Sequence, residues 1–114
     1  MNIHATITSP ADAIPPEVRR VQETVASFYG IPVAALTDKA RGPEKFSWPR
    51  QVAMRWVYYL FYYSAQEVGG FFGGRGHGAV LYASDTYIER YGEKRCELER
   101  LAYLLSPPPM DPDF

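Results

Sequence analysis

Cysteine, long apolar runs and a leader peptide are missing, or nearly so, from this sequence of 114 residues. Its single cysteine, Cys96, cannot form a disulfide within the chain, which favours a reducing compartment such as the cytoplasm. No run of about 18 or more apolar residues occurs, so no helix is expected to span a membrane. The segment before Val18 contains no Lys or Arg and no apolar core, and we therefore expect no signal peptide.

Residue clusters that are typical of catalysis or cofactor binding are also missing. The two histidines, His4 and His77, lie far apart in the sequence, and no carboxylate pair or metal-spaced group accompanies either of them. The glycine-rich stretch 69–78 lacks the lysine of a phosphate-binding G-x-x-x-x-G-K-[ST] loop, so no nucleotide-binding module is expected. We therefore expect neither an enzyme nor a protein with a metal or another cofactor.

The sequence does contain enough apolar residues, 46% of the chain, to form the core of one domain. Its charge is unevenly distributed along the chain. The formal net charge is −1, but residues 39–75 hold six basic and two acidic side chains, a local charge of +4. Such a local excess of basic residues is typical of a DNA-contact surface. We expect a flexible N-terminus (1–14), a folded domain (15–105) and a proline-rich flexible tail (106–114). A complete small chain is the expectation, with a fragment of a longer protein as the alternative.

Proline, glycine and serine divide the domain into helices, and no strand pattern is present, which predicts an all-α bundle. Pro49 is expected to begin a central helix that is apolar nearly all the way round. A basic, Gly/Pro-broken stretch, the basic segment (residues 38–50), precedes and enters that helix. The predicted helices cover 16–29, 32–36, 49–64, 65–72, 77–91 and 93–105. In the helix from His77 to Tyr91, the spacing predicts that Val80, Leu81, Ser84 and Ile88 face the core.

The stretch from Phe71 to Glu89 carries the strongest functional signal. Ser64 and Glu67 form a predicted capping box that begins a short helix, and a Gly-Gly-Arg-Gly turn then leads into the helix at His77. Glycine is needed in so tight a turn, and the start of the next helix offers unpaired N–H groups and a positive dipole to an anion such as phosphate. The pattern predicts a helix-turn-helix whose second helix enters the major groove.

These residues resemble the C-terminal DNA-binding domain of the bacterial replication initiator DnaA. The matching pieces occur in order within a stretch of roughly half of the chain: GIPVAAL (30–36), the basic loop that holds Arg41, PRQVAM (49–54), S..EVG (64–69) and FFGGRGHGAVLYA (71–83). The resemblance implies an all-α, DnaA-like or Trp-repressor-like helix-turn-helix that binds a short asymmetric site in double-stranded DNA. The ATP-binding module that accompanies this domain in the initiator is absent from the sequence.

The resemblance also implies a set of DNA-contacting positions. An arginine of the basic segment enters the minor groove in the family, and Arg41 or Lys45 is the candidate here. Arg50 is favoured as a phosphate contact over a solvated side chain, Arg75 could bind phosphate or the carbonyls at the preceding helix end, and His77 could contact DNA or cap its helix. The full predicted set is Arg41, Lys45, Arg50, Gln51, Ser64, Ala65, Gln66, Arg75, Gly76, His77, Gly78 and Ala79.

The sequence departs from the family where bases are contacted. The family's Asp-His-Thr-Thr is Gly76-His77-Gly78-Ala79 here, and a family lysine on the central helix is replaced by Tyr58. Aspartate would cap the helix and accept from a cytosine amino group, and threonine would offer a hydroxyl and a methyl group. Losing one good base contact costs about 1–3 kcal/mol of discrimination. Weakened or altered sequence preference is therefore expected.

The run from Tyr58 to Tyr63 leaves three interpretations open. The last helix and the proline-rich tail could cover the tyrosines, which is the interpretation that we favour slightly. Alternatively Tyr58, Tyr59, Tyr62 and Tyr63 could form a surface for a protein partner or a second copy of the chain. Stacking on single-stranded bases is a third use. The competing function is therefore a protein-interaction module on a helix-turn-helix scaffold.

Overall fold

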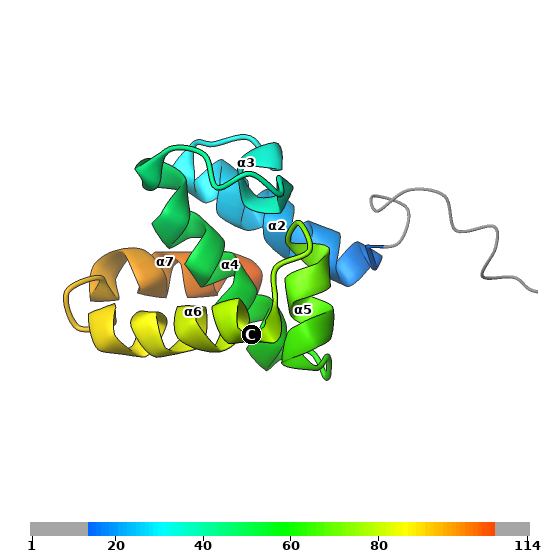
Figure 1. The fold of residues 1–114 in the computed structure, drawn as a ribbon. Helices are drawn as coiled ribbons and strands as arrows, with labels where there is room; N and C mark the ends of the chain where they lie inside the picture. The colour runs from blue at the N-terminus through cyan, green and yellow to red at the C-terminus, as the bar shows by residue number, and fades with distance from the viewer. Residues whose placement is uncertain (1–13, 107–114) are drawn as a thin grey trace, which may run out of the picture.

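The computed structural model describes residues 14–106, and within this range the chain folds into helices without any strand (Figure 1). This confirms the predicted all-α class. The predicted flexible ends, apart from residues 14 and 106, lie outside the described residues. Across the described range, no helix combines the length and the apolar character that a membrane crossing would require. In chain order the helices are α2 (Pro16–Tyr29), α3 (Ala34–Thr37), the 3₁₀ helix η2 (Glu44–Phe46), α4 (Ser47–Leu60), α5 (Ala65–Phe71), α6 (His77–Arg90) and α7 (Arg95–Leu105).

Helix α2 begins and ends at the residues that the sequence predicts. Pro16 occupies the first turn, where a missing N–H group costs no hydrogen bond. Gly30 ends the helix in the left-handed conformation, with φ 69° and ψ 36°, which a residue without Cβ adopts at little cost. One face of α2 is buried against α4, and it carries Val18, Val21, Val25 and Ala26.

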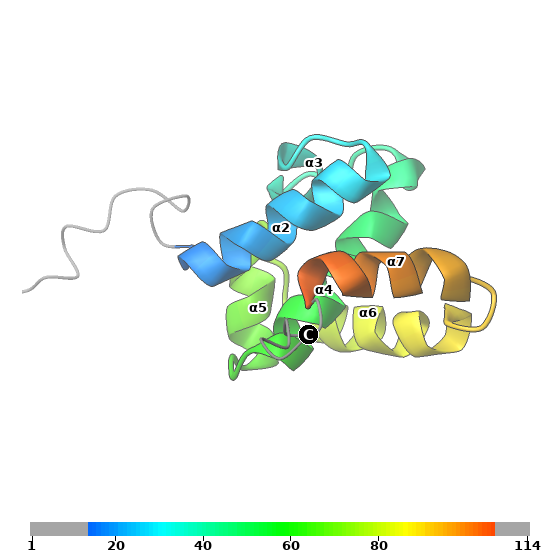
Figure 2. The same cartoon turned by 180° about the vertical axis from the view of Figure 1, so that it is seen from behind.

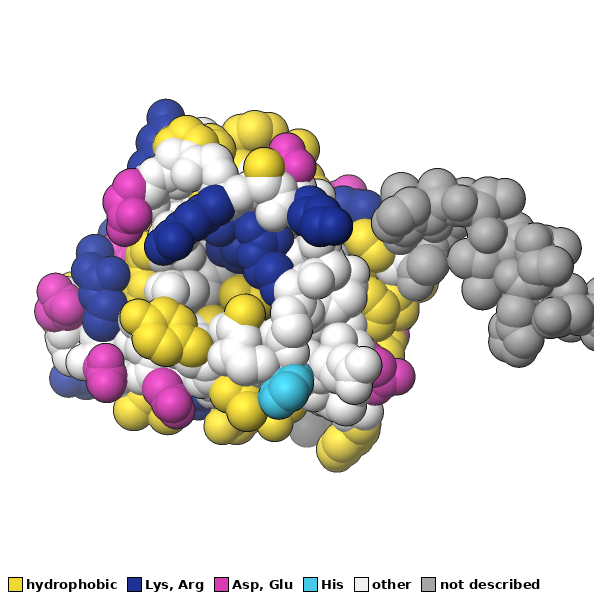
Figure 3. Space-filling model, viewed as in Figure 1, with side chains coloured by type: hydrophobic (Ala, Val, Ile, Leu, Met, Phe, Trp, Pro, Cys, Tyr) yellow, Lys and Arg dark blue, Asp and Glu magenta, His cyan; other side chains and the backbone are white. Residues whose placement is uncertain are grey.

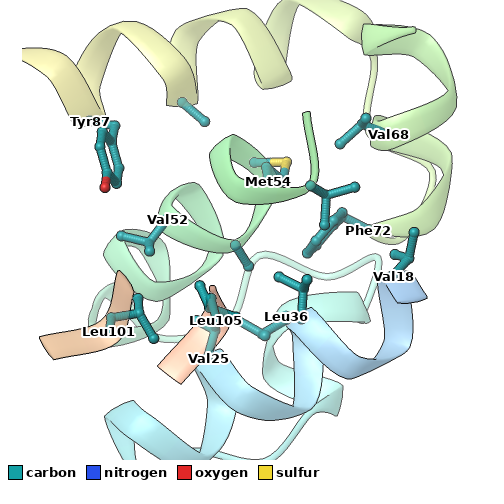
Figure 4. Close-up of a cluster of buried hydrophobic side chains, with 14 of the residues drawn as sticks. Val18, Val25, Leu36, Val52, Met54, Val68, Phe72, Tyr87, Leu101 and Leu105 are labelled. Atoms are coloured by element: carbon teal, nitrogen blue, oxygen red, sulfur yellow. The ribbon is translucent and has the colours of Figure 1, made fainter. Parts of the chain in front are cut away.

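Helix α4 lies in the middle of the bundle, in contact with α2, α5 and α6. It begins at Ser47, two residues before the predicted start, because η2 already winds the chain; Pro49 then falls in the first turn, where it is tolerated. It ends at Leu60, four residues before the predicted end, because Phe61 is extended. Figure 4 shows the buried side chains that meet around α4: Val18, Val25, Leu36, Val52, Met54, Val68, Phe72, Leu101 and Leu105.

The connection between α5 and α6 has the predicted helix-turn-helix form. The capping box is confirmed: the Glu67 N–H donates to Ser64 Oγ at 3.1 Å, and the Ser64 N–H donates to Glu67 Oε1 at 2.8 Å. Gly73 and Gly74 have φ values of 79° and 77°. The Gly69 carbonyl accepts from the N–H groups of Phe72 and Arg75, and this closes the turn.

Helix α6 buries two of its four predicted core residues, Val80 and Ser84. The buried residues are Val80, Ala83, Ser84 and Tyr87, whereas Leu81 and Ile88 are exposed, so that part of the prediction is wrong. Two apolar rows run side by side along this helix, and their spacing alone does not decide which one faces α4 and α5. Contact with those two helices selects the row that includes Ala83 and Tyr87.

Helix α7 packs against α2 at the back of the molecule, as Figure 2 shows. Its Leu98, Leu101 and Leu105 are buried. The Glu97 carboxylate accepts hydrogen bonds from Tyr29 Oη at 2.6 Å and from Trp48 Nε1 at 2.8 Å. Partial burial of Glu97 disfavours its charge, but these two hydrogen bonds outweigh that cost and lower the pKa of the carboxyl.

Candidate nucleic-acid interface

A hollow on the face shown in Figure 3 lies between α6 and the basic segment, and Lys and Arg side chains gather in and around it. Three arginines from different parts of the chain meet here: Arg41 of the basic segment, Arg50 of α4 and Arg75 of the turn before α6. We call them the arginine cluster. Burial of Arg50 and the charges of Arg75 and Arg41 lower the pKa of the Arg50 guanidinium. Within residues 14–106, no member of the cluster forms a salt bridge.

Arg50 lies at the floor of this region rather than at its surface. Only 5% of the residue is exposed, and its Nη2 atom donates to the carbonyls of Ala35 at 2.7 Å and Arg41 at 2.9 Å. This placement corrects the direct phosphate contact that the sequence favours, because the guanidinium is enclosed and holds α3 and the basic segment in position. The sequence cannot show this, since both partners are backbone carbonyls.

Arg75 joins the turn to the basic segment. Its Nη1 atom donates to the carbonyl of Asp38 at 2.9 Å and to that of Phe72, the residue that follows α5. Of its two predicted roles, carbonyl bonding at the helix end is therefore the one that the structure shows. Burial lowers the pKa of Arg75, and the charge of Asp38 opposes that effect. Gly73 lies close to the same stretch of backbone. A Cβ at Gly73 would be 2.7 Å from the Thr37 carbonyl oxygen.

The rim of the hollow carries the exposed cations. Arg41 and Lys45 are both exposed, as a DNA contact requires, and Lys45 also lies 5.7 Å from the centre of the Phe46 ring. Lys39 is exposed as well, and with Arg19 it lines a groove of about 550 Å³ beside Gly73 and Gly74. Lys39 is not in the predicted set of DNA contacts, although its position inside the basic segment was a signal for it.

The start of α6 is open to solvent. Gly76, His77 and Gly78 are exposed and Ala79 is half-buried; a Cβ at Gly76 or Gly78 would meet no atom within 4 Å. No side chain caps the helix, so His77 does not take the capping role that was its structural alternative. The backbone N–H groups of this first turn therefore face an unobstructed surface. Base contact by His77 stays a prediction.

The start of α5 and the polar side of α4 hold the other predicted contacts. The Ser64 hydroxyl is occupied by its capping bond, Ala65 is half-buried and Gln66 is exposed. Gln51 is half-buried on α4. The structure brings these residues onto the helix-turn-helix scaffold, and their contact with phosphate stays a prediction.

The exposed side of α6 changes character along its length. Beyond its glycine-rich first turn comes Tyr82, which is 65% exposed, and then the exposed carboxylates Asp85 and Glu89. The magenta side chains over the C-terminal half of α6 in Figure 3 mark this change. Because carboxylates repel phosphate, only the first turns of α6 are electrostatically suited to DNA.

The tyrosine run divides into two groups. Tyr58 and Tyr63 are half-buried at the edge of the core, and the Tyr63 hydroxyl donates to Glu17 Oε2 at 2.6 Å. Tyr59 is 60% exposed and Tyr62 is fully exposed, so the interpretation that α7 covers the run is wrong for these two. The proline-rich tail lies outside the described residues. An Arg55 guanidinium lies 3.7 Å from the centre of the Tyr59 ring.

Arg55 is a structural residue that the sequence did not single out. Its Nη1 atom donates to Ser84 Oγ at 2.8 Å and to the Ser84 carbonyl at 3.1 Å, which fastens α4 to α6.

Among residues 14–106, no group of three or more His, Cys, Asp and Glu side chains is placed to hold a metal ion.

Comparisons with known proteins agree with this architecture. The family model described as the bacterial dnaA protein helix-turn-helix matches residues 18–86, a range that includes α5, the first ten residues of α6 and the arginine cluster. The chain is 47% identical over 88 residues to the chromosomal replication initiator protein DnaA of Bordetella pertussis, which aligns 77% of this chain with 18% of that protein. Identity is 37% over 89 residues, 78% of this chain and 20% of the relative, for DnaA of Magnetococcus marinus. It is 46% over 76 residues, 67% of this chain and 14% of the relative, for DnaA of Paraburkholderia phymatum.

The chain thus spans about a fifth or less of the length of these relatives. The matched range includes the turn glycines and the arginine cluster. Helix α7, from Arg95 to Leu105, lies beyond the family match. On the extent of the match and the shared helix-turn-helix, the chain belongs to the bacterial DnaA helix-turn-helix family.

Proposed function

We propose that this domain binds double-stranded DNA through the hollow between α6 and the basic segment. The observation that carries the proposal is the arginine cluster. Arg50 and Arg75 donate to carbonyls of residues 35–41, the stretch that includes exposed Arg41. No member forms a salt bridge among the described residues, although the charge of Asp38 acts on Arg50 and Arg75. A polyanion is the natural counter-charge for such a site, and membership of the DnaA helix-turn-helix family supports DNA as that polyanion.

The proposed docking assigns different tasks to the cations. Arg41, Lys39 and Lys45 contact the DNA backbone or the minor groove, because they are exposed at the rim. Arg50 and Arg75 hold the segment that carries those cations. The open first turn of α6, from His77, enters the major groove, where its backbone N–H groups and dipole favour a phosphate.

We also propose weakened or altered sequence preference relative to the initiator. Gly76 and Gly78 present no side chain, and Ala79 offers only a methyl group to a thymine methyl. Neither glycine is required by the backbone, because both face open space. The missing groups are therefore a property of the contact surface and not of the fold. Binding to duplex DNA would place the protein with the nucleoid in the cytoplasm.

The proposal is tested by fluorescence titration of the purified chain against the family's site and a scrambled duplex, each at two salt concentrations. Arg41→Ala should weaken binding to both duplexes and reduce the salt slope by about one unit, the value for one phosphate contact. Arg95→Ala is the matched control, because Arg95 is exposed on α7 and pairs with Glu99 at 3.0 Å. No binding by the unmodified chain at low salt, or equal effects of the two substitutions, would refute the docking.

The exposed tyrosines support a second candidate, a protein-interaction or self-association surface. Tyr59 and Tyr62 are exposed next to Leu60 and Phe61, and tyrosine supplies large contact area at little entropic cost. Sedimentation of the unmodified chain and of a Tyr59→Ser, Tyr62→Ser double variant would test self-association. A concentration-dependent dimer that the double variant loses would support it, and a monomer at high concentration would exclude it.

A further inference from the structure

We propose that Tyr82 replaces the missing side chains of α6 as the residue that contacts a base, with its ring packed on the methyl group of a thymine. The inference rests on the proposed DNA binding and adds a specificity-determining residue to it. The resemblance places base contact at residues 76–79 and implies no role for Tyr82.

The position of Tyr82 on α6 is the first step. It lies four residues after Gly78 and three after Ala79, and residues at these spacings share one face of a helix. A helical side chain points toward the N-terminus, so a residue covers the surface over the turn that precedes it. The Tyr82 ring can therefore lie over the surface that Gly78 and Ala79 leave uncovered.

The space in front of this surface is free. A Cβ at Gly78 would meet no atom within 4 Å, and Tyr82 is 65% exposed. Tyr82 takes no part in the hydrophobic core, in an aromatic pair or in a side-chain hydrogen bond within the described residues. The other large aromatic of α6, Tyr87, is by contrast buried and stacked on Trp48. The fold therefore gives Tyr82 no structural task.

Charge limits the contact to this part of α6. Asp85 and Glu89 are exposed one and two turns further on, and Arg90 forms a salt bridge with Glu93 at 3.1 Å. Phosphate is disfavoured beside the two carboxylates, so the DNA must approach through the first two turns. Tyr82 is the last side chain of the exposed face before the carboxylates begin.

The ring selects the type of base. Apolar side chains in the major groove pack against the C5-methyl group of thymine, which the other three bases do not carry. Neighbouring Ala79 presents a second small apolar surface on the same side of the helix. The geometry therefore points to one or more thymines opposite the first two turns of α6.

The test begins with selection of the preferred duplex from a random pool by the unmodified chain. Each thymine of that duplex is then replaced by deoxyuridine, which removes only the methyl group, and affinities are measured for the unmodified chain, Tyr82→Ala and Tyr82→Phe. Tyr103→Ala is the matched control, because Tyr103 is similarly exposed, at 63%, but lies on α7 at the back of the molecule (Figure 2). Circular dichroism melts verify that all variants fold.

The unmodified chain and Tyr82→Phe should lose about fourfold in affinity at one thymine, the factor that corresponds to burial of a single methyl group. Tyr82→Ala should show no loss at that position, and Tyr103→Ala should behave like the unmodified chain. The inference is overturned if Tyr82→Ala keeps the full thymine dependence, or if the unmodified chain binds DNA without any sequence preference. Complete absence of binding by the unmodified chain would overturn the proposed function instead, and the inference with it.

Discussion

Gly69 and Gly70 are neighbours in α5, yet the structure predicts opposite effects when each is replaced by alanine. A Cβ at Gly69 would lie 1.9 Å from the carbonyl oxygen of Arg75 and 2.8 Å from its carbonyl carbon. A Cβ at Gly70 would meet no atom within 4 Å. Neither glycine has a positive φ, so the difference arises from space and not from backbone strain.

The magnitude follows from what must move. Ordinary contact begins at about 3.4 Å, so Gly69→Ala must displace the turn backbone by about 1.5 Å. The displacement strains the hydrogen bond from the Arg75 N–H to the Gly69 carbonyl, now 2.9 Å long. Overpacking costs about 1–3 kcal/mol, and a backbone obstacle belongs at the upper end of that range. Removing a helical glycine returns about 0.5–1 kcal/mol, which leaves a net loss of about 2 kcal/mol.

The assay is thermal unfolding of the two variants, followed by circular dichroism. For a domain of this size a change of 1 kcal/mol shifts Tm by about 4–8 °C, so Gly69→Ala should lower Tm by about 8–16 °C. Gly70→Ala should raise Tm by a few degrees. Its added methyl group meets no atom, and alanine loses less conformational entropy than glycine when the helix folds. If Gly69→Ala melts with the unmodified chain, or if both variants lose equal stability, the assigned packing of α5 against the turn is incorrect.

Three further predictions concern the site and its support. Gly78→Ala should raise the free energy of unfolding by about 0.5–1 kcal/mol, because its Cβ enters open space; a decrease in a urea titration would contradict this. Arg50→Ala should lower the free energy of unfolding by about 2 kcal/mol, since it removes charged hydrogen bonds to two carbonyls, whereas Arg41→Ala at the exposed rim should leave stability within about 0.5 kcal/mol. Equal melting of these two variants would show that Arg50 does not hold the basic segment. Glu97→Gln should destabilise the chain at neutral pH, and its deficit should shrink below pH 4.5: the folded-state pKa is lowered, so the stabilisation is complete above the ordinary value of 4.5 and is lost as the pH falls through the folded value. A deficit that stays constant from pH 7 to pH 3 in urea titrations would exclude a charged Glu97 as its cause.

Most helix ends were predictable from local chemistry. Pro16, Gly30 and the Ser64–Glu67 capping box mark ends that the backbone fixes within a few residues, whatever the rest of the chain does. The face that α6 buries was not predictable, because two apolar rows compete and only contact with α4 and α5 distinguishes them. The same limit applies to Gly69 and Gly70, which differ only in what a Cβ would meet across the turn.

The candidate site was predictable as a region and less so as individual roles. The basic segment, the turn and the start of α6 all lie where the sequence placed them. The tasks of Arg50 and Arg75 were not fixed by the sequence, because their partners are carbonyls of residues 35–41 and 72, and backbone groups leave no pattern in a sequence. The proposed base contact by Tyr82 was not predictable for the opposite reason: within residues 14–106 its side chain has no hydrogen-bond or aromatic partner, and it gains meaning only beside Gly78 and Ala79.

The arginine cluster also makes the proposed DNA binding compatible with a net charge of −1. Residues 76–114 hold four basic and seven acidic side chains, a local charge of −3, and on α6 the exposed carboxylates Asp85 and Glu89 come only after its first turns. Helix α7, at the back of the bundle (Figure 2), carries two basic and two acidic side chains and has no net charge. At physiological ionic strength charges are screened over about 8 Å, so a phosphate at the hollow interacts mainly with the cations around it. Arg50 and Arg75 hold the backbone of residues 35–41 by hydrogen bonds to its carbonyls, so this backbone need not rearrange when the exposed cations bind a ligand. Hydrogen bonds to residues 35–41 determine where the cations lie. For the proposed DNA binding, the positions of these cations therefore matter more than the net charge of the chain.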